Sequence, residues 1–424
     1  MTKAKPSVIQ GSGAILPWPA RLLIGAQMLF VAFGALVLVP LLTGLDPSIA
    51  LFTAGAGTLL FHLITGAQVP IFLASSFAFI APIIYGIKTF GPGATLGAMA
   101  GVGLVYLVFS WLAGMGKAEG IKRYLPSVVT GPVIMVIGLK LAPVAVNMAV
   151  SFKGDGVKDP QAVLVALVSL ITAIIVVTYG RKLLSLIPIL CGIGAGYILS
   201  LLMGKVDFSP VYEAGWLVNP WTAALAAGSF AWPVFDPAAL LYMLPVAIAP
   251  AIEHVGDILA ISSVTGKDFV TKPGLHRTLM GDGLATSMAA LLGGPPNTTY
   301  SEVTGAVALT KAFDPVYMII AAVFAILLAF IGKLGAILRT IPSPVMGGVM
   351  LLLFGMIASV GMRSLIKDRV DIGKSRNLII ISLILVFGIG DMSISLGRFE
   401  LGGIGLAGLV GLLLNLLLPG RDND

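Results

Sequence analysis

The chain has 424 residues, of which 58% are hydrophobic and 11% are charged, and its formal net charge is +7. Soluble domains carry about 25% charged residues, so this composition excludes an ordinary soluble fold and indicates an integral membrane protein. The basic excess does not indicate nucleic-acid binding, because the basic residues are scattered in short stretches between apolar runs.

Apolar runs that could cross a bilayer recur along the whole chain. A spanning helix needs roughly 20 apolar residues, so we expect an all-α polytopic membrane protein with about fourteen transmembrane segments. The expected spans are residues 20–44, 48–65, 69–86, 92–115, 126–149, 161–179, 183–203, 238–264, 276–293, 295–311, 314–337, 342–364, 377–396 and 400–418. The longest connection, residues 204–237, contains Trp216, Trp221 and Trp232. It is expected to be an extracytoplasmic segment at the membrane surface, because Trp favours the headgroup level.

The distribution of positive charge supports this span count. With the N-terminus inside, eighteen Lys and Arg residues fall on the cytoplasmic side and seven on the outer side, and Lys140 falls within a span. Cytoplasmic loops are enriched in Lys and Arg. We therefore expect a multi-pass protein of the inner (cytoplasmic) membrane with both termini in the cytoplasm.

An internal repeat relates the two halves of the chain. Pro126-Ser-Val-Val-Thr-Gly-Pro-Val133 opens the fifth span and Pro342-Ser-Pro-Val-Met-Gly-Gly-Val349 opens the twelfth. Seven spans separate the copies, so they have opposite orientations, as in the inverted repeats of secondary transporters. This predicts one seven-span repeat in residues 1–203 and a second, inverted one in residues 238–424.

The third span of each half is unusual. Residues 69–82 and 293–305 both begin near Pro and carry clusters of Ser and Thr at membrane depth. Such backbone is tolerated in a membrane only where protein or a water-filled cavity satisfies its hydrogen bonds. Interrupted segments at matching places in two halves predict the binding site.

Four carboxylates lie inside the expected spans: Glu253, Asp257, Asp282 and Glu302. Each costs about 2.5–3.5 kcal/mol at the centre of a spanning helix, and the sequence offers no obvious cationic partner within the spans. Glu253 and Asp257, four residues apart, share one helix face. Carboxylates in such surroundings can take up and release protons. Asp282 has an alternative role, which is to cap a helix break beside its neighbouring glycines.

The remaining polar candidates are weaker. His254 follows Glu253 and points about 100° further round the helix, where it either relays a proton or packs against a backbone carbonyl. The single cysteine, Cys191, cannot form an intrachain disulfide. We expect no metal site, no cofactor and, without a phosphate-binding Walker loop, no nucleotide hydrolysis.

Five motifs are spread along the chain. They are Ser75-Ser-Phe-Ala-Phe79, Glu253-His-Val-Gly256, Pro273-Gly-Leu-His-Arg277, Pro296-Asn-Thr-Thr-Tyr-Ser-Glu302 and Ile341-Pro-Ser-Pro-Val-Met-Gly-Gly348. Together they resemble the nucleobase–cation symporter family, which includes the nucleobase–ascorbate transporters and the bacterial uracil permeases. The resemblance covers nearly the whole chain. It implies fourteen spans in two inverted sevens, with short strands in spans 3 and 10 that meet at the substrate.

The resemblance also implies an assembly and a site. Spans 1–4 and 8–11 would form a core domain, spans 5–7 and 12–14 a gate domain, and two copies a homodimer. Glu253 and Glu302 would accept hydrogen bonds from the N–H groups of a nucleobase. Phe77 would stack on the ring or present its backbone, and Tyr300 and the amide of Ser301 would line the pocket. The candidates for proton coupling are Asp257, Glu253, His254 and Glu302.

The substrate remains open between pyrimidine and purine. Uracil permeases often have His where this chain has Asp257, whereas purine carriers often have Asp there. Purine carriers in turn often have Gln where this chain has Glu302. We favour import of uracil with a proton by alternating access, and keep xanthine, urate or another purine as the alternative.

Two other classes are less favoured. A small-anion carrier of the same architecture would want a cation near spans 3 and 10, where the sequence offers acids. A membrane-embedded enzyme would need a nucleophile and a base, and no such set is evident.

Overall fold

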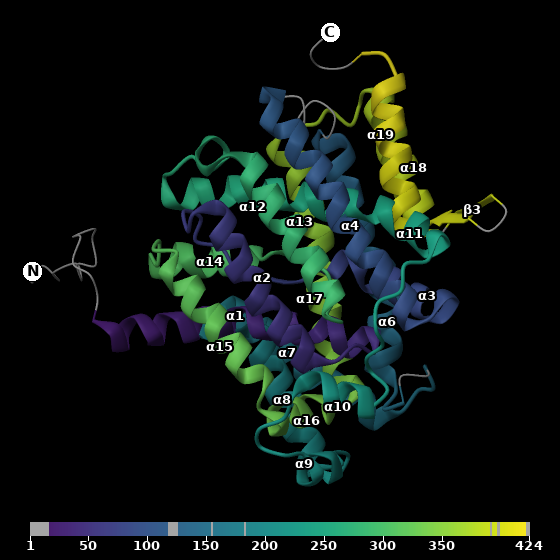
Figure 1. Cartoon of the computed structure of the whole chain (residues 1–424). Coiled ribbons are helices and arrows are strands. Elements are labelled where there is room, and N and C mark those ends of the chain that lie inside the picture. Colours follow the sequence, from purple (N-terminus) through teal and green to yellow (C-terminus); the bar gives the residue numbers. More distant parts are fainter. Residues whose placement is uncertain are drawn as a thin grey trace, which may run out of the picture.

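The computed structural model describes residues 17–117, 126–153, 156–181, 184–390, 392–396 and 399–420. The expected cytoplasmic termini concern residues 1–16 and 421–424, which lie outside the described residues. Helices dominate the described chain (Figure 1). The first half contains α1 (Trp18–Thr43), α2 (Pro47–Thr65), β1 (Leu73–Ser75), η1 (Phe77–Phe79), α3 (Ile80–Phe90), α4 (Pro92–Leu112), η2 (Ala113–Lys117), α6 (Ser127–Val150), α7 (Pro160–Tyr179), η3 (Leu184–Leu186) and α8 (Pro188–Leu202).

The second half also consists mainly of helices, and its described residues include three short strands. The expected connection contains α9 (Ser209–Glu213) and α10 (Pro220–Ala226). The elements that follow are α11 (Pro237–Met243), η4 (Leu244–Ala247), α12 (Ile248–Thr265), η5 (Val270–Gly274), α13 (Leu275–Leu291), β2 (Asn297–Thr299), α14 (Ser301–Thr310), α15 (Val316–Ala329), α16 (Gly332–Arg339), α17 (Ser343–Lys367), α18 (Ser375–Ile389), β3 (Ser393–Leu396), β4 (Phe399–Gly402) and α19 (Gly403–Leu417).

Seven helices among the described residues are long and apolar enough to cross a membrane. They are Trp18–Thr43, Pro47–Thr65, Pro92–Met115, Ser127–Val150, Pro160–Tyr179, Pro237–Thr265 and Ser343–Lys367. Five apolar helices are shorter, with 10–17 residues each. Many begin where the sequence places Pro in the first turn, a position that needs no backbone N–H. In α2, Asp46 also caps the helix by accepting hydrogen bonds from the amides of Ser48 and Ile49.

Two expected spans differ from the structure. The span expected at 314–337 divides into α15 and α16, because the amides of Val218 and Gly332 bond to Phe330 and Trp216 carbonyls and draw the intervening backbone out of the helix. The span expected at 377–396 ends at Ile389. The next residues form the antiparallel hairpin β3–β4, and α19 starts after it.

The helices pack in two groups. In the first group, which we call the strand bundle, α2 packs on α13 and α15, α1 packs on α15, and α4 packs on α13. In the second group, the α17 bundle, α17 packs on α6, α7 and α8, while α18 and α19 pack on each other and on α6 (Figure 1). Helices α12 and α14 contact each other in the strand bundle, and α12 also contacts α6 and α19.

The two copies of the Pro-Ser motif begin α6 and α17, and these helices pack closely along their lengths. A Cβ placed on Gly131 would lie 2.8 Å from the Gly361 carbonyl oxygen, and one on Gly347 would lie 2.3 Å from the Ala149 amide nitrogen. The start of each helix therefore meets the end of the other, so α6 and α17 run antiparallel. Glycine at these points allows the two backbones to approach.

The strands β1 and β2 come from opposite halves of the chain and pair with each other. They are antiparallel, with Leu73 opposite Thr299 and Ser75 opposite Asn297. They contact α2, α12 and α13 in the interior of the strand bundle. All residues of both strands are buried, so the strand pair lies in the interior of the protein.

Candidate substrate-binding site

The β1–β2 pair is stabilised by hydrogen bonds from the surrounding helices. Thr58 of α2 donates its hydroxyl to the Leu73 carbonyl at 3.1 Å and accepts from the Leu73 amide at 2.9 Å. Thr286 of α13 donates to the Asn297 carbonyl at 2.7 Å. The Asn297 side chain in turn donates to the Thr53 carbonyl at 2.9 Å. These partners satisfy extended backbone at a depth where lipid could not.

Helices begin directly after each strand. The short helix η1 and α3 follow β1, and α14 follows β2. The amide of Ser76 donates to the Pro296 carbonyl at 2.9 Å, and that of Tyr300 donates to the Phe72 carbonyl at 3.1 Å, which extends the pairing on both sides. The starts of two helices are thereby held together, and the N–H groups at a helix start favour acceptor or negative groups.

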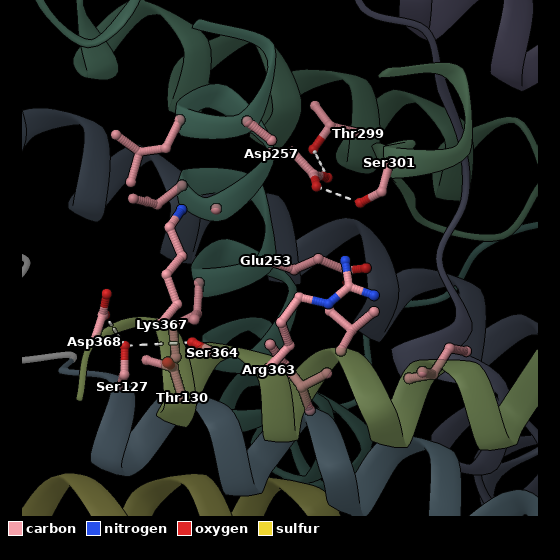
Figure 2. A pocket seen from close by; sticks show the side chains of 18 of the residues that line it. Ser127, Thr130, Glu253, Asp257, Thr299, Ser301, Arg363, Ser364, Lys367 and Asp368 are labelled. Atoms are coloured by element: carbon pink, nitrogen blue, oxygen red, sulfur yellow. Dashed lines mark hydrogen bonds between the residues drawn. The ribbon is translucent and has the colours of Figure 1, made fainter. Parts of the chain in front are cut away.

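Asp257 links α12 to the second of these helix starts. Its two carboxylate oxygens accept hydrogen bonds from the hydroxyls of Thr299, at 2.7 Å, and Ser301, at 2.5 Å (Figure 2). The side chain is buried, with 5% exposed. The protonation state of the Asp257 carboxylate is therefore coupled to the hydrogen bonds at the junction of β2 and α14.

Glu253 and Glu302 lie on the same cavity as Asp257. Glu253 is one turn earlier on α12, and Glu302 is in the first turn of α14. Both are half-buried and line a central cavity of about 940 Å³. The sequence spacing thus predicted correctly that Glu253 and Asp257 share a face, and the strand pairing brings Glu302 to them from 45 or more residues away.

Two aromatic residues complete this wall of the central cavity. Tyr300 is 2% exposed, and its hydroxyl donates to the Ser75 carbonyl at 2.8 Å, which ties α14 to β1. The rings of Tyr300 and Phe77 lie nearly parallel, with centroids 6.5 Å apart and an interplanar angle of 14°. Phe77, Tyr300 and Ser301 all line the cavity. Phe77 is the more accessible ring, so it is the one available to a flat ligand.

His254 and Asp282 form a separate buried pair behind this wall. Both side chains are fully buried, and His254 Nδ1 lies 3.2 Å from Asp282 Oδ2. The expectation that Asp282 caps a helix break is wrong, because α13 continues from Leu275 to Leu291 and Asp282 lies near its middle. The sequence missed the pair because its members come from different helices.

The opposite wall of the central cavity carries residues that sequence reasoning missed. Arg363 and Lys367, one turn apart on α17, line the cavity together with Ser127 and Thr130 of α6. Figure 2 shows both basic side chains extending from α17 toward the wall that carries Glu253. The sequence offered no obvious cationic partner within the spans, but Arg363, at the end of the expected span 342–364, lines the same cavity as the acids. The antiparallel packing of α6 and α17 places these four residues on the cavity. In the sequence, only the four-residue spacing of Arg363 and Lys367 indicates that these two share a helix face.

Comparison with known proteins identifies a family for this chain. The Permease family model matches residues 20–396. A probable uracil permease of Haemophilus influenzae is 56% identical over 401 residues, which cover 95% of both chains. The uracil permease of Bacillus caldolyticus is 47% identical, covering 94% of this chain and 92% of that protein. The uracil permease of Escherichia coli K12 is 37% identical, covering 93% and 90%.

Solved structures of other transporters share the fold. The transmembrane domain of a cyanobacterium bicarbonate transporter, BicA, has a TM-score of 0.63 at 14% identity, covering 93% of this chain and 96% of that chain. The murine anion transporter Slc26a9 in its inward-facing state has a TM-score of 0.64 at 13% identity, covering 94% and 68%. At these identities the likeness concerns the fold alone. From the family match and the identities above, the chain belongs to the permease family, and it is a multi-pass membrane transporter rather than an enzyme.

Proposed function

We propose that this protein imports a nucleobase, with uracil favoured, together with a proton. The observation that carries the proposal is the convergence of Glu253, Asp257 and Glu302 with the paired strand ends on one cavity. A nucleobase edge alternates N–H and C=O groups. Carboxylates accept hydrogen bonds from the first, and amides at helix starts donate to the second. The names of the relatives, which are uracil permeases, support the same class of substrate.

The roles of the individual residues follow from their positions. Glu253 and Glu302 bind the N–H groups of the base, Phe77 stacks on its ring, and Tyr300 and the Ser301 amide complete the pocket. Asp257 carries the coupling proton. Its two hydroxyl partners suit this role because a hydroxyl can donate to a carboxylate or turn and accept from a carboxylic acid. A change in the protonation of Asp257 then alters its hydrogen bonds with Ser301 and Thr299, which adjoin the bound base.

The proposed transport cycle is a movement of one bundle against the other. In this proposal the strand bundle is the core of spans 1–4 and 8–11, and the α17 bundle is the gate of spans 5–7 and 12–14. In this proposal the fourteen spans form two inverted sevens, residues 1–203 and 238–424, joined by the extracytoplasmic segment 204–237. The protein resides in the inner membrane with both termini in the cytoplasm, and it assembles as a homodimer.

Two alternatives make different predictions. A purine carrier would use the same acids for xanthine or urate, and the size of the cavity admits either ring system. An anion carrier has in its favour the cations Arg363 and Lys367, but these lie on α17, across the cavity from the strands and their carboxylates. Acids at the strand ends would repel an anion at the position where the helix starts could bind it.

Competition for uptake tests the proposal. Labelled uracil is supplied to proteoliposomes that contain the purified protein, with an inward proton gradient and an excess of unlabelled uracil, xanthine, urate, bicarbonate or sulfate. We expect uracil to compete fully and the inorganic anions to have no effect. Full competition by xanthine or urate would assign a purine carrier, and uptake of labelled sulfate or bicarbonate without uracil uptake would overturn the proposal.

A further inference from the structure

A second, smaller cavity adjoins the central one at Glu302. This side pocket has a volume of about 230 Å³ and lies between α1, α8, α14 and α17. Glu302, Leu353 and Met356 line both cavities. The side pocket therefore opens beside a carboxylate to which the proposed function assigns a ring N–H of the base.

The lining of the side pocket is mainly apolar. Phe30 of α1, Leu190 of α8, Leu309 of α14 and Val349 of α17 contribute to its walls. Gly305 also lines it, one turn after Glu302, and a Cβ built there meets no atom of the described residues within 4 Å. A small base bound at Glu302 leaves this space unfilled, because the base interacts through its polar edge.

We propose that the side pocket binds an apolar substituent on a pyrimidine whose ring is held in the central cavity. The proposal rests on the proposed function, since it places the ring at Glu253 and Glu302. The ligand class is a uracil that carries an alkyl group on carbon 5 or 6, the edge of the ring without the two N–H groups. Each methylene buried in an apolar site contributes about threefold to fourfold in affinity.

The position of the pocket gives such a ligand a second property. Helices α1 and α14 belong to the strand bundle, whereas α8 and α17 belong to the α17 bundle. A group that fills the space between them opposes movement of one bundle past the other. Alkylated uracils therefore bind and inhibit, and they are not carried across the membrane.

Equilibrium binding to the full-length protein in lipid nanodiscs tests the site. Dissociation constants are measured for uracil, 5-propyluracil and 6-propyluracil. We expect one of the two propyl compounds to bind about tenfold or more tightly than uracil, and to inhibit uracil uptake in proteoliposomes without exchanging for labelled uracil loaded inside. Affinities of both propyl compounds at or below that of uracil would overturn the proposal, because a lipid chain or a shifted side chain would then fill the pocket.

Gly305→Leu provides the matched variant, because its side chain extends into the side pocket. We expect its uracil affinity to stay within about twofold of the original and the advantage of the propyl compound to disappear. Gly194→Leu is the control, since Gly194 is equally open among the described residues but lines neither cavity. A propyl advantage that survives in Gly305→Leu would place the alkyl group elsewhere and overturn the proposal. Failure of uracil itself to bind the unaltered protein would instead refute the proposed function.

Discussion

At the scale of single residues, the cavity carboxylates Glu253, Asp257 and Glu302 have different surroundings and should respond differently to substitution. Asp257 has two hydroxyl donors at 2.7 and 2.5 Å, whereas Glu253 and Glu302 are half-buried and face the cavity. The hydroxyl donors hold the Asp257 carboxylate in place, whereas the carboxylates of Glu253 and Glu302 are available to a ligand. Amide substitutions, which preserve shape and remove charge, separate these roles.

Glu302→Gln should abolish or severely weaken uracil uptake. A hydrogen bond to a charged acceptor is worth about 1.5–3 kcal/mol, and a neutral amide oxygen cannot replace it fully. The variant should still insert and fold, because Gln costs less to bury than a carboxylate. Labelled-uracil uptake, normalised to protein in the membrane, measures the effect. Glu213→Gln, on the exposed helix α9, is the control, and uptake by Glu302→Gln equal to that control would contradict the assignment.

Asp257→Asn and Glu253→Gln should divide binding from coupling. Asp257→Asn resembles the protonated acid, so it should bind uracil within roughly tenfold of the original, or about 1.4 kcal/mol, and lose accumulation driven by a pH gradient. Glu253→Gln should lose binding itself. Calorimetry on purified protein, beside uptake in proteoliposomes, measures both quantities. If Asp257→Asn concentrates uracil normally, Asp257 is structural, and His254 and Glu302 become the next candidates for the proton.

The spacing along the chain predicted that Glu253 and Asp257 meet, but it did not predict what lies across the cavity from them. Glu253 and Asp257 are close along one helix, so helical geometry places them on one face. The pairing of His254 with Asp282, and the placement of Arg363 on the central cavity, depend on which helices pack together. The periodicity of the sequence does not encode that packing. A buried carboxylate without a sequence neighbour of opposite charge should therefore be expected to have a distant partner.

At the scale of secondary-structure elements, the sequence predicted helices best where a single long apolar run forms one uninterrupted helix. Helices α1, α2, α6, α7 and α17 begin and end within a few residues of the expected spans. The expectation failed at 314–337, where hydrogen bonds from residues 216–218 interrupt the helix, and at 377–396, where the chain forms the β3–β4 hairpin. Both expected spans were wrong because the backbone there forms hydrogen bonds with other segments, and hydropathy carries no information on such pairing.

Gly361→Ala should destabilise the contact between α6 and α17. Its Cβ would lie 2.4 Å from the Gly131 carbonyl oxygen, so one helix must move away from the other. Overpacking of this kind costs typically about 1–3 kcal/mol. Gly355→Ala on the same helix is the matched control, because a Cβ there meets no described atom within 4 Å. Thermal unfolding in detergent compares the two, and equal unfolding temperatures would show that this contact does not limit stability.

At the scale of the whole molecule, the proposed coupling determines how uptake responds to the proton gradient. An inward proton gradient can concentrate a neutral base only if a proton crosses with it. Uptake should therefore rise as the external pH falls and collapse when a protonophore is added. Sodium should not substitute, since in this proposal the coupled ion is the proton that Asp257 carries. Sodium-dependent uptake that ignores the protonophore would refute proton coupling.

The strand pair has a consequence for how the protein is made. The pocket wall requires Ser75 opposite Asn297, and the two strands are separated by more than half of the chain. While the ribosome is still synthesising the second half, β1 has inserted without the strand that satisfies its backbone. The backbone of β1 in the first half of the chain therefore lacks its pairing partner until Asn297–Thr299 have been synthesised. Either half expressed alone should be inactive and quickly degraded, and co-expression of the two halves as separate chains should restore a working carrier.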